Sequence, residues 1–206
     1  MIGASLAMFP LGTVLFPYTF LPLRVFEPRF LKLTADCLAA DQEFGVVLIE
    51  RGVEVGGGDT RFAVATVAKI VQAERSADGF HLGTVGTRRI TVTRWLPDNP
   101  YPRAEFEPLE DGGDDTADPG ALEMITVRLR RVLGFCAELG DPAVSATVEL
   151  HDDPTIALWQ ACACAPVGPI DQLRLLGTRG VTARVDVLRE MLDDEALVLS
   201  HRLSSG

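Results

Sequence analysis

An apolar segment that proline interrupts at short intervals opens the chain and limits what it can form. Residues 8–30 read MFPLGTVLFPYTFLPLRVFEPRF. Proline has no amide hydrogen and a fixed φ angle, so a regular helix cannot run through Pro10, Pro17 and Pro22. The segment is therefore a poor membrane-spanning helix and predicts Pro-bounded extended stretches and loops. It leads into Pro28, which fits the first position of a helix.

Patterns of strand length dominate the chain up to residue 109, with one helix among them. Strands are predicted where apolar and β-branched residues form runs bounded by turn residues. These runs are residues 44–49, 61–72, 80–85, 90–95 and 104–109. Residues 76–79 (SADG) predict a turn, so the strands on either side of it should pair antiparallel. Residues 28–38 predict the helix, because one face at helical spacing is expected to be buried: Phe30, Leu31, Thr34, Ala35, Cys37 and Leu38.

An acidic stretch divides the chain. Residues 110–120 (EDGGDDTADPG) are rich in Asp and Gly and show no apolar periodicity, so they predict a solvated connector. The spacing of apolar residues is typical of strands before this stretch and of helices after it. We therefore expect a β-rich domain, an acidic linker and a helical subdomain. Their boundaries are residues 1–110, 111–120 and 121–206.

Several helices are predicted in the last part of the chain. Apolar residues recur at helical spacing over residues 122–139, and Gly140 should end this helix. Asp153 is expected to cap a second helix, which has Pro154 at its first position. Thr182 is expected to cap the final helix.

The opening segment carries the most specific motifs of the chain. FPL stands at residues 9–11, LFP at 15–17, LPL at 21–23 and VFEPR at 25–29. This order and spacing resembles the start of the N-terminal substrate-binding domain of the Lon protease family. Matching positions continue to residue 106, and the helical part that follows resembles the end of that region more loosely, so the resemblance covers most of the chain. The resemblance implies an α+β fold, in which a PUA-like β-barrel with one inserted helix is followed by a C-terminal helical bundle.

A full Lon enzyme would add an ATPase module and a serine–lysine protease module. With 206 residues, the chain has no room for either module behind the matched region. A phosphate-binding loop ends in Gly-Lys-Ser/Thr, and neither Lys32 nor Lys69, the only lysines, stands in such a sequence. A serine–lysine dyad needs a desolvated lysine, and none follows Lys69. We expect a stand-alone family member that is not an enzyme.

Charge and cysteine spacing disfavour several kinds of partner. The formal net charge of -10 disfavours nucleic acid, because its binding depends on cationic side chains. No lysine or arginine precedes Arg24, so the charged start of a secretory signal is absent and we expect a cytoplasmic protein. No cofactor, metal or membrane is expected to bind. The cysteines lack the paired spacing of a zinc site and are expected to be buried free thiols: Cys37, Cys136, Cys162 and Cys164.

The resemblance and the aromatic content of the opening segment indicate recognition of an unfolded or flexible polypeptide, or of a protein partner. Six aromatic residues fall within residues 9–30, and exposed apolar surface is the physical requirement for holding an unfolded chain. Most of these rings must be core, with Phe26 and Phe30 expected among them, but we expect residues 18–20 to form a loop that exposes at least one. The candidate binding residues are Phe16, Tyr18, Phe20, Arg24, Glu27 and Arg29.

Glu27 and Arg29 have two interpretations. Either residue can make a polar contact to a bound peptide. Alternatively, Glu27 favours the positive end of the helix that opens at Pro28, and Arg29 pairs with a carboxylate of the barrel. We favour this second, structural interpretation.

Two other functions stay open at this point. One is a small-molecule sensor that uses a pocket where the barrel meets its helix. The other is an RNA-binding module, suggested by analogy with PUA-like folds and disfavoured by the net charge of -10. The identity of the client and the oligomeric state are left undetermined.

Overall fold

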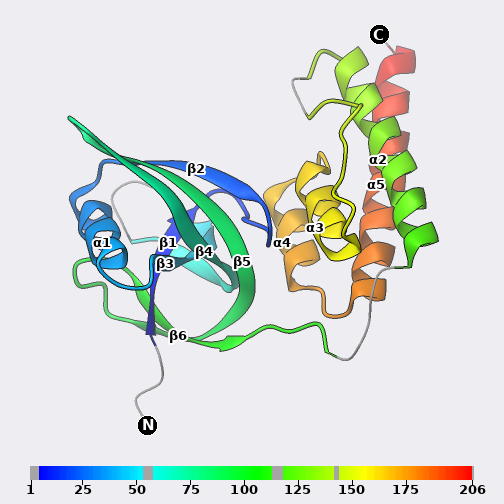
Figure 1. Ribbon diagram of the computed structural model, residues 1–206. Coiled ribbons are helices and arrows are strands. Elements are labelled where there is room, and N and C mark those ends of the chain that lie inside the picture. Colours follow the sequence, from blue (N-terminus) through cyan, green and yellow to red (C-terminus); the bar gives the residue numbers. More distant parts are fainter. Residues whose placement is uncertain (1–4, 53–57, 113–117, 142–143, 206) are drawn as a thin grey trace. The chain divides into compact units, whose positions relative to one another are not determined.

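Six strands and one helix build the first part of the chain, and four helices build the second, among the residues that the structure describes (Figure 1). The computed structural model describes residues 5–52, 58–112, 118–141 and 144–205. The chain divides into two units, residues 1–110 and 111–206. The α+β class expected from the sequence is confirmed. None of the described helices is both long and apolar enough to cross a lipid bilayer.

The first unit is a mixed sheet whose order is β2-β5-β4-β3-β1-β6. An additional pairing of β5 with β6 joins β5, β4, β3, β1 and β6 into a closed ring of neighbours. β2 pairs only with the first part of β5, so it lies outside this ring and the unit is less regular than a simple barrel. The elements are β1 (Ser5–Leu11), β2 (Phe20–Val25), α1 (Pro28–Leu38), β3 (Glu43–Arg51), β4 (Thr60–Ser76), β5 (Gly79–Leu96) and β6 (Arg103–Pro108).

The long strand β5 replaces two strands predicted from the sequence. Residues 80–85 and 90–95 were expected to be separate, but Gly86, Arg88 and Arg89 all keep partners on β4. A register shift between Val67 and Ala68 absorbs the bend at this point, so the strand continues. The first half of β5 therefore pairs with β2, and its second half pairs with β6.

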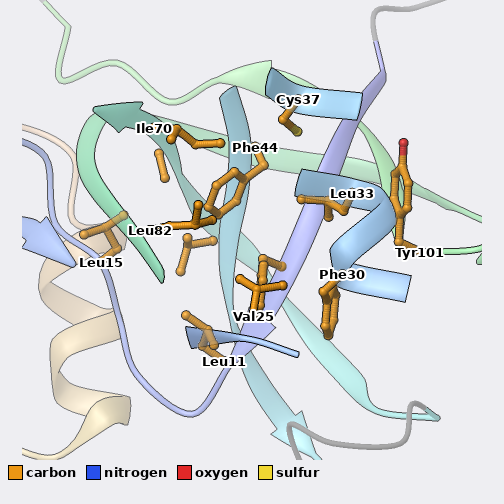
Figure 2. Packing of buried hydrophobic residues seen from close by; sticks show 13 residues of the cluster. Leu11, Leu15, Val25, Phe30, Leu33, Cys37, Phe44, Ile70, Leu82 and Tyr101 are labelled. Carbon is orange, nitrogen blue, oxygen red and sulfur yellow. The ribbon is translucent and has the colours of Figure 1, made fainter. Parts of the chain in front are cut away.

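The main core of this unit lies between the sheet and α1 (Figure 2). The rings of Phe9 and Phe30 stack with their centroids 4.1 Å apart, and Phe44 lies 5.8 Å from Phe9. Helix α1 begins at Pro28, as predicted, but the buried face includes Leu33 and leaves Ala35 exposed. The face is therefore rotated slightly from the one that the spacing suggested.

Two buried threonines fix the Pro-rich opening segment to the sheet. Thr66 Oγ1 donates to the Leu15 carbonyl at 2.6 Å, and Thr84 Oγ1 donates to the Leu21 carbonyl at 2.7 Å. A buried carbonyl group needs a hydrogen-bond partner. The backbone around Leu15 is irregular and belongs to no strand that would provide one. These hydroxyls therefore hold the segment in one conformation.

The second unit consists of α2 (Pro119–Glu138), α3 (Pro154–Cys164), α4 (Pro169–Gly177) and α5 (Val181–Ser205). As predicted, Asp153 caps α3 by accepting from the amides of Thr155 at 2.8 Å and Ile156 at 3.1 Å. The prediction that Thr182 caps the last helix is wrong, because α5 already begins at Val181. Helix α2 begins inside the stretch assigned to the linker, and residues 113–117 of that stretch lie outside the described residues.

A buried arginine organises one end of the helical unit. The Arg184 side chain is 1% exposed, and its guanidinium lies 3.9 Å from the centroid of the Trp159 ring. It forms an ion pair with Asp111 and donates to the Thr178 carbonyl at 2.8 Å. Asp111 also accepts from the Gly180 amide at 3.1 Å. The first acidic residue of the expected linker is thus bound to the helical unit rather than fully solvated.

Candidate functional site

Exposed and buried side chains alternate along strand β2 and the residues next to it in the sequence. The side chains at positions 18, 20, 22, 24 and 26 are exposed, whereas those at 21, 23 and 25 are half-buried or buried. Successive side chains of a strand point to opposite faces, so one face of β2 meets the core and the other faces water. Because Phe20 is the first residue of β2, the expectation that residues 18–20 all lie in a loop is wrong.

The turn before β2 is held by strand β5. The Phe16 carbonyl accepts from Thr19 Oγ1 at 2.7 Å, and the Tyr18 amide donates to the Gly86 carbonyl at 2.7 Å. A Cβ atom on Gly86 would lie only 2.1 Å from the Phe16 carbonyl oxygen, so this close approach requires glycine. The turn is therefore a fixed part of the sheet.

Tyr18 adopts an unusual backbone conformation in this turn. Its φ angle is 59°, in the left-handed region that residues with a Cβ atom rarely occupy. Pro17 precedes it, and a proline followed by a positive φ is typical of a type II turn. The Tyr18 side chain is 47% exposed, so the strained residue presents its ring to solvent.

Phe20 is the most exposed aromatic residue of this region, at 60%. Its ring lies over Gly83 of β5, where an added Cβ atom would be 3.0 Å from Phe20 Cε2. The glycine leaves a shallow depression of about 290 Å³ on the outer face of β2, β5 and β4. We call this surface the β2 face; it is lined by Phe20, Pro22, Leu23, Arg24, Gln72, Glu74, His81, Leu82 and Gly83.

Arg24 lies at the polar rim of the β2 face. Its guanidinium forms an ion pair with Asp78, and both side chains are largely exposed. The hydrogen bond from Arg24 holds the pKa of the Asp78 carboxyl below its usual range. Because exposed ion pairs are screened and contribute little to stability, Arg24 is available for a further polar contact.

Glu27 and Arg29 lie at the start of α1 and pair with each other. Arg29 Nε donates to Glu27 Oε2 at 3.2 Å, and the Arg29 guanidinium lies 4.4 Å from the centroid of the Phe30 ring. Both side chains are mostly buried, and Glu27 makes no side-chain cap to the helix. The positive charge of Arg29 also contributes, after the hydrogen bond from Arg61, to lowering the pKa of the Asp59 carboxyl. The pairing of Arg29 with a carboxylate of the barrel stays a prediction.

Asp59 belongs to a buried charge cluster that stiffens this end of the sheet. Its carboxylate pairs with Arg61, which also contacts Asp98 at 2.9 Å and lies 4.9 Å from the centroid of the Trp95 ring. Burial alone would raise the pKa of the Asp59 carboxyl, but the hydrogen bond from Arg61 and nearby positive charge bring it below its usual range. Such a fully paired cluster has a structural role.

Two aromatic residues lie elsewhere than expected. Phe16 is 1% exposed, so its ring lies inside the protein and we do not include it in the candidate surface. Phe26, expected in the core, is 50% exposed, because it continues the outward alternation that begins at Phe20. The sequence also missed Gln72, His81 and Gly83 of the β2 face. Only the pairing of β2 with β5 and β4 brings them together, and no local signal marks them.

The described residues show no grouping of three or more histidine, cysteine or acidic side chains that could hold a metal ion. Cys37, Cys136 and Cys162 are buried, and Cys164 is half-buried. Burial raises the pKa of the Cys37 thiol to about 11, and it raises the pKa of Cys164 as well. Cys37 therefore stays protonated at neutral pH and is a poor nucleophile.

Comparison with known proteins decides the family. The model of the ATP-dependent protease La (LON) substrate-binding domain matches residues 5–194. The chain belongs to this family. The family match spans both units of the structure, so the helical unit is part of the Lon substrate-binding domain as well as the sheet.

Curated relatives of this Lon domain are much longer proteins. The chain is 29% identical to the Lon protease of Anaeromyxobacter dehalogenans over 100% of this chain and 25% of the relative. It is 28% identical to Lon protease 2 of Myxococcus xanthus, over 100% of this chain and 26% of the relative. The chain therefore spans about a quarter of the length of these relatives.

Solved structures show the same fold. The Lon N-terminal domain protein from Xanthomonas campestris superposes with a TM-score of 0.65 at 29% identity, over 92% of this chain and 98% of that chain. The N-terminal domain of Mycobacterium avium complex Lon protease shares the fold, with a TM-score of 0.62 at 17% identity over 93% of this chain and 99% of that chain.

Proposed function

We propose that this chain recognises segments of unfolded or flexible polypeptide through the β2 face and catalyses no reaction itself. Membership of the Lon substrate-binding domain family supports the class of ligand. The exposure of Phe20 supports the location on the β2 face, because its aromatic ring is 60% exposed and is fixed on a folded strand over Gly83. Exposed apolar surface with a polar rim is typical of interaction sites.

The geometry suits weak and adaptable binding. The β2 face is shallow, so a client contributes a few side chains rather than a folded surface. Tyr18 and Phe26 flank Phe20 on the exposed side of the same segment, and Arg24 supplies a donor for carbonyl or carboxylate groups. Because the sheet already orders these rings, little conformational entropy is lost on binding. We expect an affinity on the order of micromolar, since a flat patch has few deep hot spots.

The binding test uses a permanently unfolded protein, reduced and carboxymethylated lactalbumin carrying a fluorescent label. Fluorescence anisotropy should show saturable binding to the chain. Phe20→Ala should weaken it about tenfold, since an exposed aromatic anchor commonly contributes more than 1 kcal/mol. Leu197→Ala is the matched control, because Leu197 is also an exposed apolar residue but lies on α5. The melting temperatures of both variants should stay close to that of the parent chain.

Three outcomes would contradict this proposal. If unfolded lactalbumin shows no saturable binding, the proposed function is wrong. If Phe20→Ala and Leu197→Ala lose the same affinity, the proposed location on the β2 face is wrong. Binding that disappears after nuclease treatment of the sample would favour the RNA-binding alternative, which the net charge of -10 disfavours.

Catalysis is tested separately, because the full sequence has no phosphate-binding lysine and no lysine after Lys69. Lys32 bonds Asp36 at 2.5 Å, and Lys69 bonds the Asp41 carbonyl at 2.5 Å, both on the exposed surface. We expect neither ATP hydrolysis nor casein cleavage above background. Turnover that follows the chain through a second purification step would contradict this expectation.

A further inference from the structure

Strand β2 has one edge that no other strand covers. In the described part of the chain it stands at the end of the sheet order and pairs with β5 alone. Residues of an antiparallel strand alternate between bonding their neighbour and facing away from it. The Gly86 amide donates to the Thr19 carbonyl at 3.0 Å, which makes Thr19 a bonded position. The alternation then directs the backbone groups of Phe20, Pro22 and Arg24 away from β5.

Pro22 agrees with this assignment. Proline has no amide hydrogen, so within a sheet it occupies edge positions whose N–H side faces outward. Throughout the described ranges, no backbone group of Phe20, Pro22 or Arg24 bonds a residue outside the β2–β5 ladder. The edge therefore offers the amides of Phe20 and Arg24 and the carbonyls of all three residues.

An apolar groove lies at the end of this free edge that leads into α1. It has a volume of about 170 Å³ and none of its lining residues comes from β5, so it lies on the unpaired side of β2. A single water occupies about 30 Å³ of the liquid, so the groove has room for a side chain. In Figure 2 the labelled Leu11, Val25 and Phe30 lie at one end of the core cluster. The lining is Phe9, Leu11, Leu23, Arg24, Val25, Phe26, Glu27 and Phe30.

We infer that an extended apolar segment of an unfolded polypeptide adds to the free edge of β2 as a further strand. The inference rests on the proposed function and specifies its mode of binding. A peptide that enters an apolar groove must satisfy its own backbone groups, and the β2 edge offers donors and acceptors at strand spacing. One side chain of the added strand enters the groove, and the side chains that point to the opposite face lie beside Phe20 on the β2 face.

A competing explanation assigns Pro22 a protective role. Proteins place proline on edge strands to prevent unwanted pairing, and β2 is also short. Pro22 removes one amide of the edge, however, and the amides of Phe20 and Arg24 remain on either side of it. The two explanations differ at position 24, because strand addition requires the Arg24 amide and a protected edge makes no use of it.

The first test changes the probe and leaves the protein intact. The probe is a short fluorescein-labelled peptide in which valine alternates with serine or threonine, and anisotropy measures its binding. Two further peptides carry N-methyl groups on one alternating set of amides or on the other. Strand addition requires one set only, so one methylated peptide should bind more than about tenfold more weakly and the other close to normally. The set of amides whose methylation weakens binding reports whether the added strand runs parallel or antiparallel to β2.

The second test changes the edge. Arg24→Pro removes an outward-facing amide and spares the ladder to β5, as Pro22 already does two residues earlier. The matched control is Arg24→Ala, which removes the same charge and keeps the amide. We expect Arg24→Pro to bind the peptide and the unfolded lactalbumin about fivefold more weakly than Arg24→Ala. Pro22→Val adds an amide and should bind about fivefold more tightly.

The outcomes separate the inference from the proposed function. If unfolded lactalbumin binds while both methylated peptides match the parent peptide, strand addition is wrong and the function stands. Strand addition is also wrong if Arg24→Pro and Arg24→Ala bind equally at equal melting temperatures. It is wrong as well if the alternating peptide does not bind while unfolded lactalbumin does. If Arg24→Pro does not fold, the methylated peptides decide alone. If unfolded lactalbumin itself does not bind, the function fails too.

Discussion

The two units of the chain expose different kinds of apolar side chain. Apart from Val71 on β4, the large apolar side chains that the described sheet unit exposes are the aromatic rings of Tyr18, Phe20 and Phe26, within one short segment. The helical unit exposes mainly aliphatic residues that are spread over α2, α4 and α5, such as Val127, Ile170 and Leu197. Single exposed aliphatic residues are normal on a protein surface, whereas clustered rings on a rigid strand are not. The grouping of exposed apolar residues, and not their number, therefore locates a candidate site.

The units also differ in how they hold together. In the sheet unit, β1 pairs with β6 and β2 pairs with β5, which joins residues from opposite ends of the unit. In the helical unit, Asp118 and Asp153 cap helices that carry proline at the first turn, and Arg184 is the one buried cation among its described residues. The four predictions below test this contrast, beginning with the largest expected effect.

Asp111→Ala should destabilise the helical unit by about 3–5 kcal/mol, because it leaves the buried Arg184 guanidinium without its carboxylate. The two tryptophans report the units separately, since Trp95 lies on β5 and Trp159 on α3. Urea unfolding followed in Trp95→Phe and Trp159→Phe backgrounds should show the loss only in the Trp159 signal. Adding Arg184→Met should restore most of the stability. If the unfolding midpoints seen by Trp95 and Trp159 shift equally, the two units do not unfold independently.

Gly86→Ala should destabilise the sheet unit by about 1–3 kcal/mol, because the new methyl group overlaps the Phe16 carbonyl and must displace the turn before β2. The Trp95 signal reports the change. Gly134→Ala is the matched control, since nothing lies within 4 Å of an added Cβ atom on that helical glycine. A loss of stability in the control as large as in Gly86→Ala would show that the close approach is not the cause.

Arg29→Ala should cost about 1–2 kcal/mol, through the loss of the pair with Glu27 and of the contact with the Phe30 ring. Binding of unfolded lactalbumin should change little, because the side chain is mostly buried. The measurements are a melting curve and an anisotropy titration on the same sample. An unchanged melting temperature with lost binding would make Arg29 a binding residue and overturn the structural interpretation.

The smallest effect is expected at Tyr18, where Tyr18→Gly should be about 0.5–1 kcal/mol more stable than Tyr18→Ala. Glycine accepts the positive φ angle of 59° without strain, and part of this gain is offset by its greater freedom in the unfolded chain. Both variants lose the ring and should weaken polypeptide binding alike. Equal stabilities would indicate that the turn relaxes when the tyrosine is removed.

How far the sequence predicted the site depends on the residue. Tyr18 and Phe20 were correctly expected to include an exposed ring, because proline bounds the segment on both sides. Phe16 and Phe26 were misplaced, since aromatic content alone does not say which side of a strand faces water. The alternation that explains Phe26 becomes visible only once β2 is known to begin at Phe20.

By itself the sequence determined the features that depend on near neighbours along the chain. The start of α1 at Pro28, the cap of α3 at Asp153 and the turn at residues 77–78 follow from a few adjacent residues, because capping and turn geometry are local. The family was also readable there, from the spaced proline motifs. Tertiary structure decided the rest. The free edge of β2, the glycine under Phe20 and the burial of Arg184 depend on partners distant in sequence, and non-local pairing leaves no signal in a short window.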